Sequence, residues 1–400
     1  MKLGWRQTIR SGVAALTACL ICAALAAGQA NRGAGQPAPI EKPQMAEEVL
    51  KNVQVLRGIS MDEFMGTMGF FSSALAMNCI DCHVTEAATD WSKYADDTPL
   101  KQTARRMVLM VRAINQANFL GKPGVTCYTC HRSSDTPKIV PSIAEQYEVV
   151  PDMDPNDIKN GGRDKAPGGP SVDQILDKYI GAVGGAERLT ALTSFIAKGT
   201  IEGYDTYHVK VPLEIYAKAP NQRKMVYHTQ NGDSTAIFDG QRGWLAAVDR
   251  PLPLLALLPG AELDAARLDA DLCFPGGIKR ALNQWKAGFP VTTINDKEVN
   301  VIQGTGAGGS RFKLYFDAKT GLLVRQLRYA DTPVGMVPTQ VDYSDYREVA
   351  GVRMPFQMVV TWTDGQSNIL FTDVQPNARI DANQFDRPAP AVLKPRGGAR

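Results

Sequence analysis

The stretch that organises this chain runs from Ala104 to His131 and reads ARRMVLMVRAINQANFLGKPGVTCYTCH. It ends in Cys-x-x-Cys-His, the spacing typical of covalent attachment of a c-type haem. In such a motif the two thiols add to the vinyl groups of the porphyrin, and the adjacent imidazole is held under the iron. A second copy precedes it at residues 79–83, CIDCH. The pattern predicts two covalently bound haem c groups, attached through Cys79, Cys82, Cys127 and Cys130 and ligated by His83 and His131.

Two other uses of paired cysteines fit the sequence less well. A four-cysteine zinc site could be built from two such pairs, but 44 residues separate Cys82 from Cys127, against the usual spacing of about 15 to 20. A dithiol redox motif would not require a histidine after each pair. Cys273, in Leu272-Cys273-Phe274, is left over, and we interpret it as a small buried apolar side chain.

The N-terminus has the features of an export signal. Three basic residues precede the apolar run Ser11 to Ala27, which ends in small residues. We expect residues 1–30 to be a signal peptide, cleaved near Ala26 or Ala30, and residues 31–44 to form a flexible start. Lipoprotein processing at Cys19 and retention as a membrane anchor are the alternatives, although an apolar run of this length is short for a bilayer. The protein is therefore predicted to be exported to the periplasm.

Composition describes an ordinary globular chain. The 400 residues suggest two or three domains, 44% of them are hydrophobic, and the formal charge is only +3. No long basic block is present, so nucleic acid is excluded as a partner.

Each haem motif follows a helix with recognisable start signals. Ser60 and Glu63 form a predicted capping box, and methionines then recur at helical spacing. Thr98-Pro99 opens the second helix, which carries a stripe of apolar residues that includes Met107 and Met110. Because the chain has only four histidines, methionine is the expected second iron ligand if both haems are six-coordinate, and it would raise the potential relative to two histidines. Packing against the core is the alternative role for each methionine.

Several strings in this region resemble the multihaem cytochrome c subunit of photosynthetic reaction centres. They include Ala104-Arg105-Arg106-Met107, Arg112-Ala113-Ile114-Asn115 and the segment 125–132, VTCYTCHR. In that family the methionine ligand comes from the helix before each motif, which implies Met68 for the first haem and Met110 for the second. The family protein has four haems and this chain has two motifs, so the resemblance implies a half-unit with electron-transport function. The departure also puts a photosynthetic role in doubt.

The rest of the chain predicts an antiparallel sheet. Residues 136–170 are rich in Pro and Gly and are predicted to be a linker. Ser171 is expected to cap a short helix, after which period-two alternation predicts strands from about residue 195 to 374, interrupted by a helical insertion at about 260–286. Hairpin turns are expected at 318–321 and 363–366. The predicted fold is thus an α+β chain, in which a mainly helical dihaem module at 45–135 precedes an antiparallel β half-barrel with short helices at 171–390 and a tail at 391–400.

The pattern of turns and strands in this second half resembles the lipoprotein-carrier fold, whose concave face holds acyl chains. The strings include Asp239-Gly240 with Gly243-Trp244, and Met354-Pro355-Phe356. Candidate lining residues are equally well explained as core; they are Phe195, Ile215, Trp244, Leu314 and Trp362. No Ser/His/Asp set, phosphate loop or carboxylate pair is present, so an electron-transfer protein is favoured over an enzyme.

The resulting prediction is a periplasmic dihaem cytochrome c that relays single electrons between redox partner proteins, membrane-associated ones included. Two alternatives stay open. One is a carrier of a lipid, quinone or lipoprotein in which the haems are accessory, and the other is an oxidoreductase with one open iron.

Overall fold

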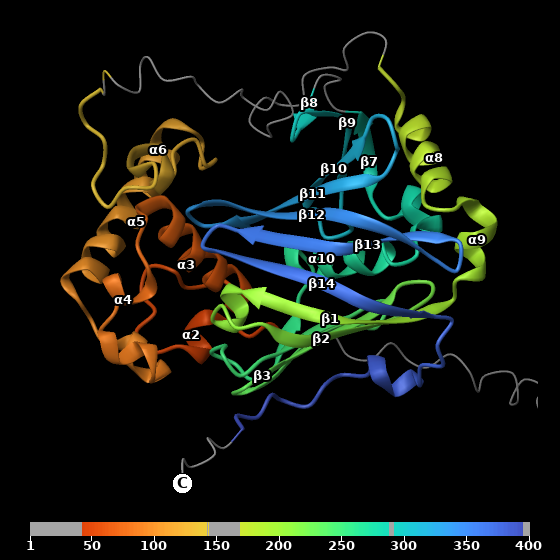
Figure 1. The fold of residues 1–400 in the computed structure, drawn as a ribbon. Coiled ribbons are helices and arrows are strands. Elements are labelled where there is room, and N and C mark those ends of the chain that lie inside the picture. Colours follow the sequence, from red (N-terminus) through yellow and green to blue (C-terminus); the bar gives the residue numbers. More distant parts are fainter. Residues whose placement is uncertain (1–41, 142, 144–168, 288–291, 395–400) are drawn as a thin grey trace, which may run out of the picture. The chain divides into compact units, whose positions relative to one another are not determined.

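The computed structural model describes residues 42–141, 143, 169–287 and 292–394. The predicted signal peptide and most of the predicted linker lie outside the described residues. The described residues from 43 onward form one compact unit with a helical part and a sheet (Figure 1). No helix of the described residues is both long and apolar enough to cross a bilayer. The chain has the expected α+β class, with a helical N-terminal region followed by an open antiparallel sheet.

The helical part begins as its capping signals predict. Ser60 accepts a hydrogen bond from the Glu63 amide, and the Glu63 side chain accepts one from the Ser60 amide, so the capping box is present. Thr98 caps the longest helix, which has Pro99 at its first position. The elements are α2 (Ala46–Val49), α3 (Met61–Leu75), α4 (Cys79–Cys82), η1 (Thr85–Ala88), η2 (Trp91–Ala95), α5 (Pro99–Asn118) and α6 (Cys127–His131).

Two helices and a long sheet follow. Helix α8 (Val172–Ala182) is capped by Ser171, as expected, and α9 (Gly185–Ala191) precedes the first strand. The strands are β1 (Ser194–Gly203), β2 (Val211–Lys218), β3 (Gln222–Thr229), β4 (Gly232–Phe238), β5 (Gly243–Ala246), β6 (Leu255–Leu257), β7 (Asn283–Ala287), β8 (Thr292–Ile294), β9 (Lys297–Thr305), β10 (Arg311–Asp317), β11 (Leu323–Thr332), β12 (Gly335–Val349), β13 (Val352–Trp362) and β14 (Gly365–Pro376). Short 3-10 helices occur at η4 (Tyr204–Thr206), η5 (Pro275–Arg280) and η6 (Ala382–Phe385).

The strands form one antiparallel sheet in the order β6-β5-β4-β3-β2-β1-β14-β13-β12-β11-β10-β9-β7, with β8 paired to β9. Both predicted hairpin turns are present, between β10 and β11 and between β13 and β14. Part of the predicted helical insertion is wrong. Residues 261–280 contain α10 (Ala261–Asp271) and η5, but residues 283–287 form β7, because they pair with β9 at the sheet edge.

The sheet is strongly curved. Helix α10 contacts β3 and β4 as well as β11, although five strands separate β3 from β11 in the sheet. An eleven-residue helix is only about 16 Å long, so the sheet must curl around it. Its concave side holds the main core, in which Phe195, Ile215 and Leu314 are buried together. Trp244 is also buried, in a neighbouring cluster, so four of the five candidate lining residues are core.

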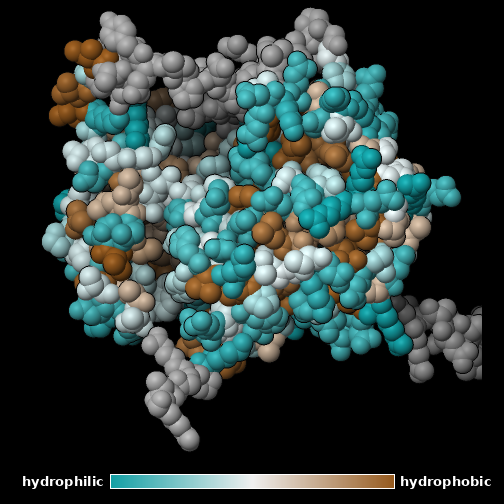
Figure 2. All heavy atoms as spheres, in the orientation of Figure 1, coloured by the Kyte–Doolittle hydropathy of each residue, from teal (hydrophilic) through white to brown (hydrophobic). Residues whose placement is uncertain are grey.

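The helical part packs on the tips of two hairpins. Phe70 and Ala74 of α3 share an apolar cluster with Val334, in the turn between β11 and β12. Gly69 of α3 lies against the turn between β13 and β14 at Asp364. On the outer surface, apolar side chains form small patches separated by polar ones (Figure 2).

Candidate haem sites and the adjoining cavity

The first Cys-x-x-Cys-His sequence folds as a capped helical turn. Asn78 accepts a hydrogen bond from the Ile80 amide, and the Asn78 amide donates to Asp81 at 2.8 Å. The His83 amide closes the turn on the Cys79 carbonyl at 3.0 Å. Residues separated by three and four positions share one side of such a turn, so both thiols and the imidazole are presented together. This is the arrangement that attachment of a flat macrocycle requires.

The surroundings of His83 disfavour its protonated form. Burial lowers its pKa, the positive charges of Lys101 and Arg105 lower it further, and a hydrogen bond with the Tyr94 backbone opposes them. Its ring lies edge-on to Tyr94, with 4.8 Å between the centroids. Its Nδ1 atom is buried without a hydrogen-bond partner among the described residues. A neutral imidazole with unused ring-nitrogen capacity fits an iron ligand.

The wall behind His83 is fixed by a polar network. Arg105 pairs with Asp97 at 2.8 Å, and Asn52 donates to the same carboxylate at 2.9 Å. Lys101 donates to the carbonyl of Tyr94 at 2.7 Å, and Thr98 donates to the carbonyl of Cys82 at 2.5 Å. These contacts join α5 to the first motif and position its cations beside the imidazole.

The second motif is a similar turn. The side chain of Thr129 accepts a hydrogen bond from the Thr126 amide at 3.0 Å. His131 Nδ1 lies 2.9 Å from the Ser134 carbonyl, so that nitrogen can donate its proton while Nε2 stays available as a ligand. Cys127 is buried, and burial raises its thiol pKa to about 11. The described cysteines form no disulfides, so the four motif thiols are free to react. Burial also raises the pKa of the fifth described cysteine, Cys273, to about 11, as it does for Cys127.

The structure places the two predicted methionine ligands differently. Met68 packs in the α3 cluster and lines the same cavity as Cys79, Cys82 and His83. Met110 is 45% exposed and does not line that cavity. On α5 the cavity is lined by Lys101, Ala104, Arg105 and Val108, and Met110 lies about 200° around the helix from Val108. The structure therefore brings the first ligand set together and leaves Met110 on a different side of α5.

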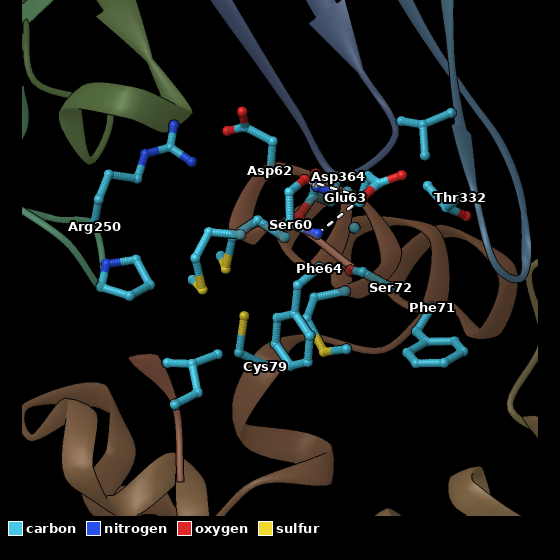
Figure 3. A pocket seen from close by; sticks show the side chains of 18 of the residues that line it. Ser60, Asp62, Glu63, Phe64, Phe71, Ser72, Cys79, Arg250, Thr332 and Asp364 are labelled. Carbon is cyan, nitrogen blue, oxygen red and sulfur yellow. Dashed lines mark hydrogen bonds between the residues drawn. The ribbon is translucent and has the colours of Figure 1, made fainter. Parts of the chain in front are cut away.

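A cavity of about 1930 Å³ adjoins the first motif. One wall comes from α3, the motif and α5. The facing wall comes from the sheet: the segment after η4, the segment between β5 and α10, and the ends of β11 and β13. Cys79, Asp62 of α3 and Arg250 all point into it (Figure 3). Trp362, the fifth candidate lining residue, lines this cavity as well.

Sequence reasoning missed the charged cluster in this cavity. Arg250 is surrounded by carboxylates, and Asp205 lies 3.9 Å from it. Burial, followed by the nearby charge of Glu262, raises the pKa of Asp62 to about 7. Asp249 Oδ1 is buried without a hydrogen-bond partner among the described residues. A signal was available, since Asp249-Arg250 interrupts an otherwise apolar run from Ala246 to Leu258. His208, which the sequence places far downstream, also lines the cavity.

Comparison with known proteins supports the helical part. A family model of the photosynthetic reaction centre cytochrome c subunit matches residues 12–161. The corresponding subunit of Thermochromatium tepidum is 39% identical over 106 residues, which are 26% of this chain and 25% of that relative. That of Rubrivivax gelatinosus is 36% identical over 113 residues, covering 26% of this chain and 29% of the relative. The chain spans about a quarter of the length of these relatives. The predicted resemblance of the N-terminal part to this family is confirmed.

The sheet resembles solved structures in fold alone. A LolA superfamily protein from Nitrosomonas europaea covers 54% of this chain and 98% of its own, with a TM-score of 0.38 and 12% identity. A DUF1329 family protein from Desulfovibrio piger covers 54% of this chain and 97% of its own, with a TM-score of 0.38 and 10% identity. The expected likeness of the C-terminal half to the lipoprotein-carrier fold is found.

Proposed function

We propose that this protein is a c-type cytochrome with two covalently bound haems that relays single electrons between redox partners in the periplasm. The observation that carries the proposal is the Cys-x-x-Cys-His sequence folded as a short capped turn at residues 79–83 and again at 127–131. The similarity of the N-terminal part to reaction centre cytochrome c subunits supports the same cofactor.

In this proposal, Cys79 and Cys82 hold the first haem, and His83 and Met68 ligate its iron. Cys127 and Cys130 hold the second, and His131 and Met110 ligate its iron. Haem iron supplies the reversible one-electron chemistry. The chain's own residues would orient the macrocycles through the motif turns, lower the pKa of His83 and give a soft second ligand that favours ferrous iron.

We also propose the domain division and the location inferred from the sequence. Residues 45–135 form the dihaem module, 136–170 a linker and 171–390 the half-barrel domain, with a tail at 391–400. Export through residues 1–30 to the periplasm would bring reduced thiols and haem together there, with an anchor or lipoprotein form as alternatives. The electron donor and acceptor would be proteins, membrane-associated ones included.

The haem content of the purified full chain tests the proposal. We expect two haems per chain that survive acid extraction of non-covalent haem, and one in a variant with Cys127→Ala and Cys130→Ala. The variant with Cys79→Ala and Cys82→Ala should likewise keep one, while Cys273→Ala should keep both. A colourless protein, or one that carries zinc, would contradict the proposal.

The cavity favours a second candidate function. Its apolar walls next to the first motif suit a bound apolar ligand or a substrate of a haem with an open iron. Carbon monoxide binding to the reduced protein distinguishes the cases, because two six-coordinate haems would not bind it readily. If a lipid can be extracted from the protein and the haems show no redox activity, the carrier function is favoured.

A further inference from the structure

We propose that the cavity beside the first motif binds a hydroquinone and that Asp62 accepts a proton from it as it is oxidised. The inference rests on the proposed function, because it requires haem at Cys79 and Cys82. It adds a substrate class and a proton acceptor, and it assigns the sheet part of the chain a role in the redox site.

The cavity is large for a small-molecule site. At about 1930 Å³ it exceeds the roughly 300–1,000 Å³ of most small-molecule pockets. A haem on the first motif would occupy the side next to Cys79 and His83. The opposite wall belongs to the segment between β5 and α10, which is separated from the motif in sequence by more than 160 residues. The cavity therefore has room for a second molecule beside the macrocycle.

The lining of this second compartment is apolar with a few polar atoms. One leucine of β5 and four from the segment line the cavity, and methionines of α3 line it from the helical part. Such walls select a ligand with an apolar body. The leucines are Leu245, Leu252, Leu255, Leu257 and Leu258.

The polar atoms require hydrogen-bond donors from the ligand. Asp249 Oδ1 is a buried acceptor with no hydrogen-bond partner among the described residues, and an unpaired buried acceptor is unfavourable. Across the cavity, Asp62 and Arg250 point toward each other (Figure 3). Carboxylates outnumber cations here, since Asp62, Asp205, Asp249 and Glu262 surround Arg250. Hydroxyl groups of a neutral aromatic ligand would satisfy these acceptors, whereas an anionic ligand would be repelled.

Asp62 also has the property of a proton acceptor at neutral pH. The groups that act on it are Glu262 of α10, Arg250 from the sheet and its neighbour Glu63. Its pKa of about 7 lets it take up and release a proton near physiological pH. An exposed carboxylate with the ordinary value of 3.8 would be a weaker base.

Oxidation of a hydroquinone needs acceptors for two electrons and two protons. Oxidation of one hydroquinone to the quinone breaks its two O–H bonds and releases two protons and two electrons. The two haems of the proposed function, held by Cys79 and Cys82 and by Cys127 and Cys130, would supply two one-electron acceptors. Asp62 takes one proton, and the second passes to Asp249 or to water at the cavity mouth.

Two assays on the haem-loaded full chain test the inference. In the first, menadione is titrated into the ferric protein by calorimetry, where no electron transfer can occur. In the second, menadiol is mixed with the ferric protein, and the ferrous haem absorption is followed over time from pH 5 to 8. We expect saturable binding of menadione at one site, and reduction of both haems by one menadiol, faster as Asp62 ionises.

The chain offers a matched control for Asp62. Asp173 occupies the same second position of α8, behind the same serine capping box, but its side chain is 80% exposed. We expect Asp62→Asn to slow menadiol oxidation at pH 7.5 by at least tenfold and Asp173→Asn to leave it unchanged. Leu255→Trp should weaken menadione binding by filling the compartment, without changing the haem content.

The outcomes separate this inference from the proposed function. Two covalent haems that ascorbate reduces but menadiol does not would overturn the hydroquinone and leave the cytochrome. Equal rates in the Asp62 and Asp173 variants would overturn the role of Asp62. Displacement of menadione by palmitate at equal concentration would assign the compartment to acyl chains. A protein without covalent haem would remove the proposed function itself.

Discussion

Asn115 of α5 clamps the backbone of Val125, two residues before the second motif. Its Nδ2 donates to the Val125 carbonyl at 2.8 Å, and its Oδ1 accepts from the Val125 amide at 2.9 Å. The clamp fixes where the turn at 127–131 begins relative to the helix that carries Met110.

Replacing Asn115 should loosen the second motif alone. Two hydrogen bonds contribute about 1–3 kcal/mol together, so Asn115→Ala should lower the free energy of unfolding by that amount. It should also reduce incorporation of the second haem and not of the first. Denaturant unfolding and mass spectrometry of haem peptides measure both. Asn118→Ala is the control, because Asn118 bonds only to its own helix, at the Ile114 carbonyl; equal effects of the two variants would contradict the clamp.

Met110→Leu tests the proposed ligand of the second haem. Loss of the thioether should abolish one methionine-to-iron absorption band and lower the potential of one haem, because the soft ligand stabilises ferrous iron. Optical redox titration measures both. Met107→Leu is the control on the same helix, one turn earlier. If Met110→Leu leaves the spectrum unchanged and Met107→Leu alters it, the ligand is Met107.

Gly335 tests the packing of the helical part on the sheet. A Cβ atom there would lie 2.4 Å from the ring of Phe70, and the residue has a φ of +154°. Gly335→Ala should cost roughly 1–3 kcal/mol of unfolding free energy, from strain and from displacement of α3. Gly309→Ala separates the two causes, since Gly309 has a φ of +92° with open space around it. If both variants lose the same stability, backbone strain alone accounts for the effect.

The raised pKa of Asp62 predicts a pH dependence of stability. Between about pH 4 and 7 the folded protein holds a proton on this carboxyl that the unfolded chain has released, so stability falls as pH rises through this window and is level above it. The full shift corresponds to an upper limit of roughly 4 kcal/mol, reduced by the partial exposure of the side chain. Asp62→Asn should therefore be the more stable protein at pH 8 and lose this part of the slope. Thermal unfolding of both proteins at pH 5 and pH 8 tests this prediction. If Asp62→Asn leaves the dependence of stability on pH unchanged, the carboxyl of Asp62 does not have a raised pKa.

The sequence predicts the features that depend on residues close together in the chain, and it does not predict those that depend on contacts between distant segments. Ser60 and Ser171 each cap a helix where predicted, and Thr98 caps the helix predicted to start at residues 97–99, because capping depends on residues within one turn. Strand alternation placed most of the sheet for the same reason. The sequence pattern predicts a helical insertion over residues 283–286 and misses β7, because this strand exists only through pairing with β9.

The cavity is formed by segments that are distant from one another in the chain. Asp62 looks like a solvated helix-start residue in the sequence, and the same pattern at Asp173 is indeed exposed. Only the curved sheet, which brings Arg250 opposite α3, changes the environment of Asp62. Proximity between segments so distant in the chain has no periodic or capping signal.

The pairing of β1 with β14 sets an order of assembly. Each motif turn is built from residues within six positions of one another, so it can form before the rest of the chain folds. The sheet cannot close until β14 is in place, because β14 lies between β1 and β13. Contacts of such long sequence separation form late. Haem would therefore be attached to an open, accessible chain, and the sheet would afterwards close over the first macrocycle and enclose it.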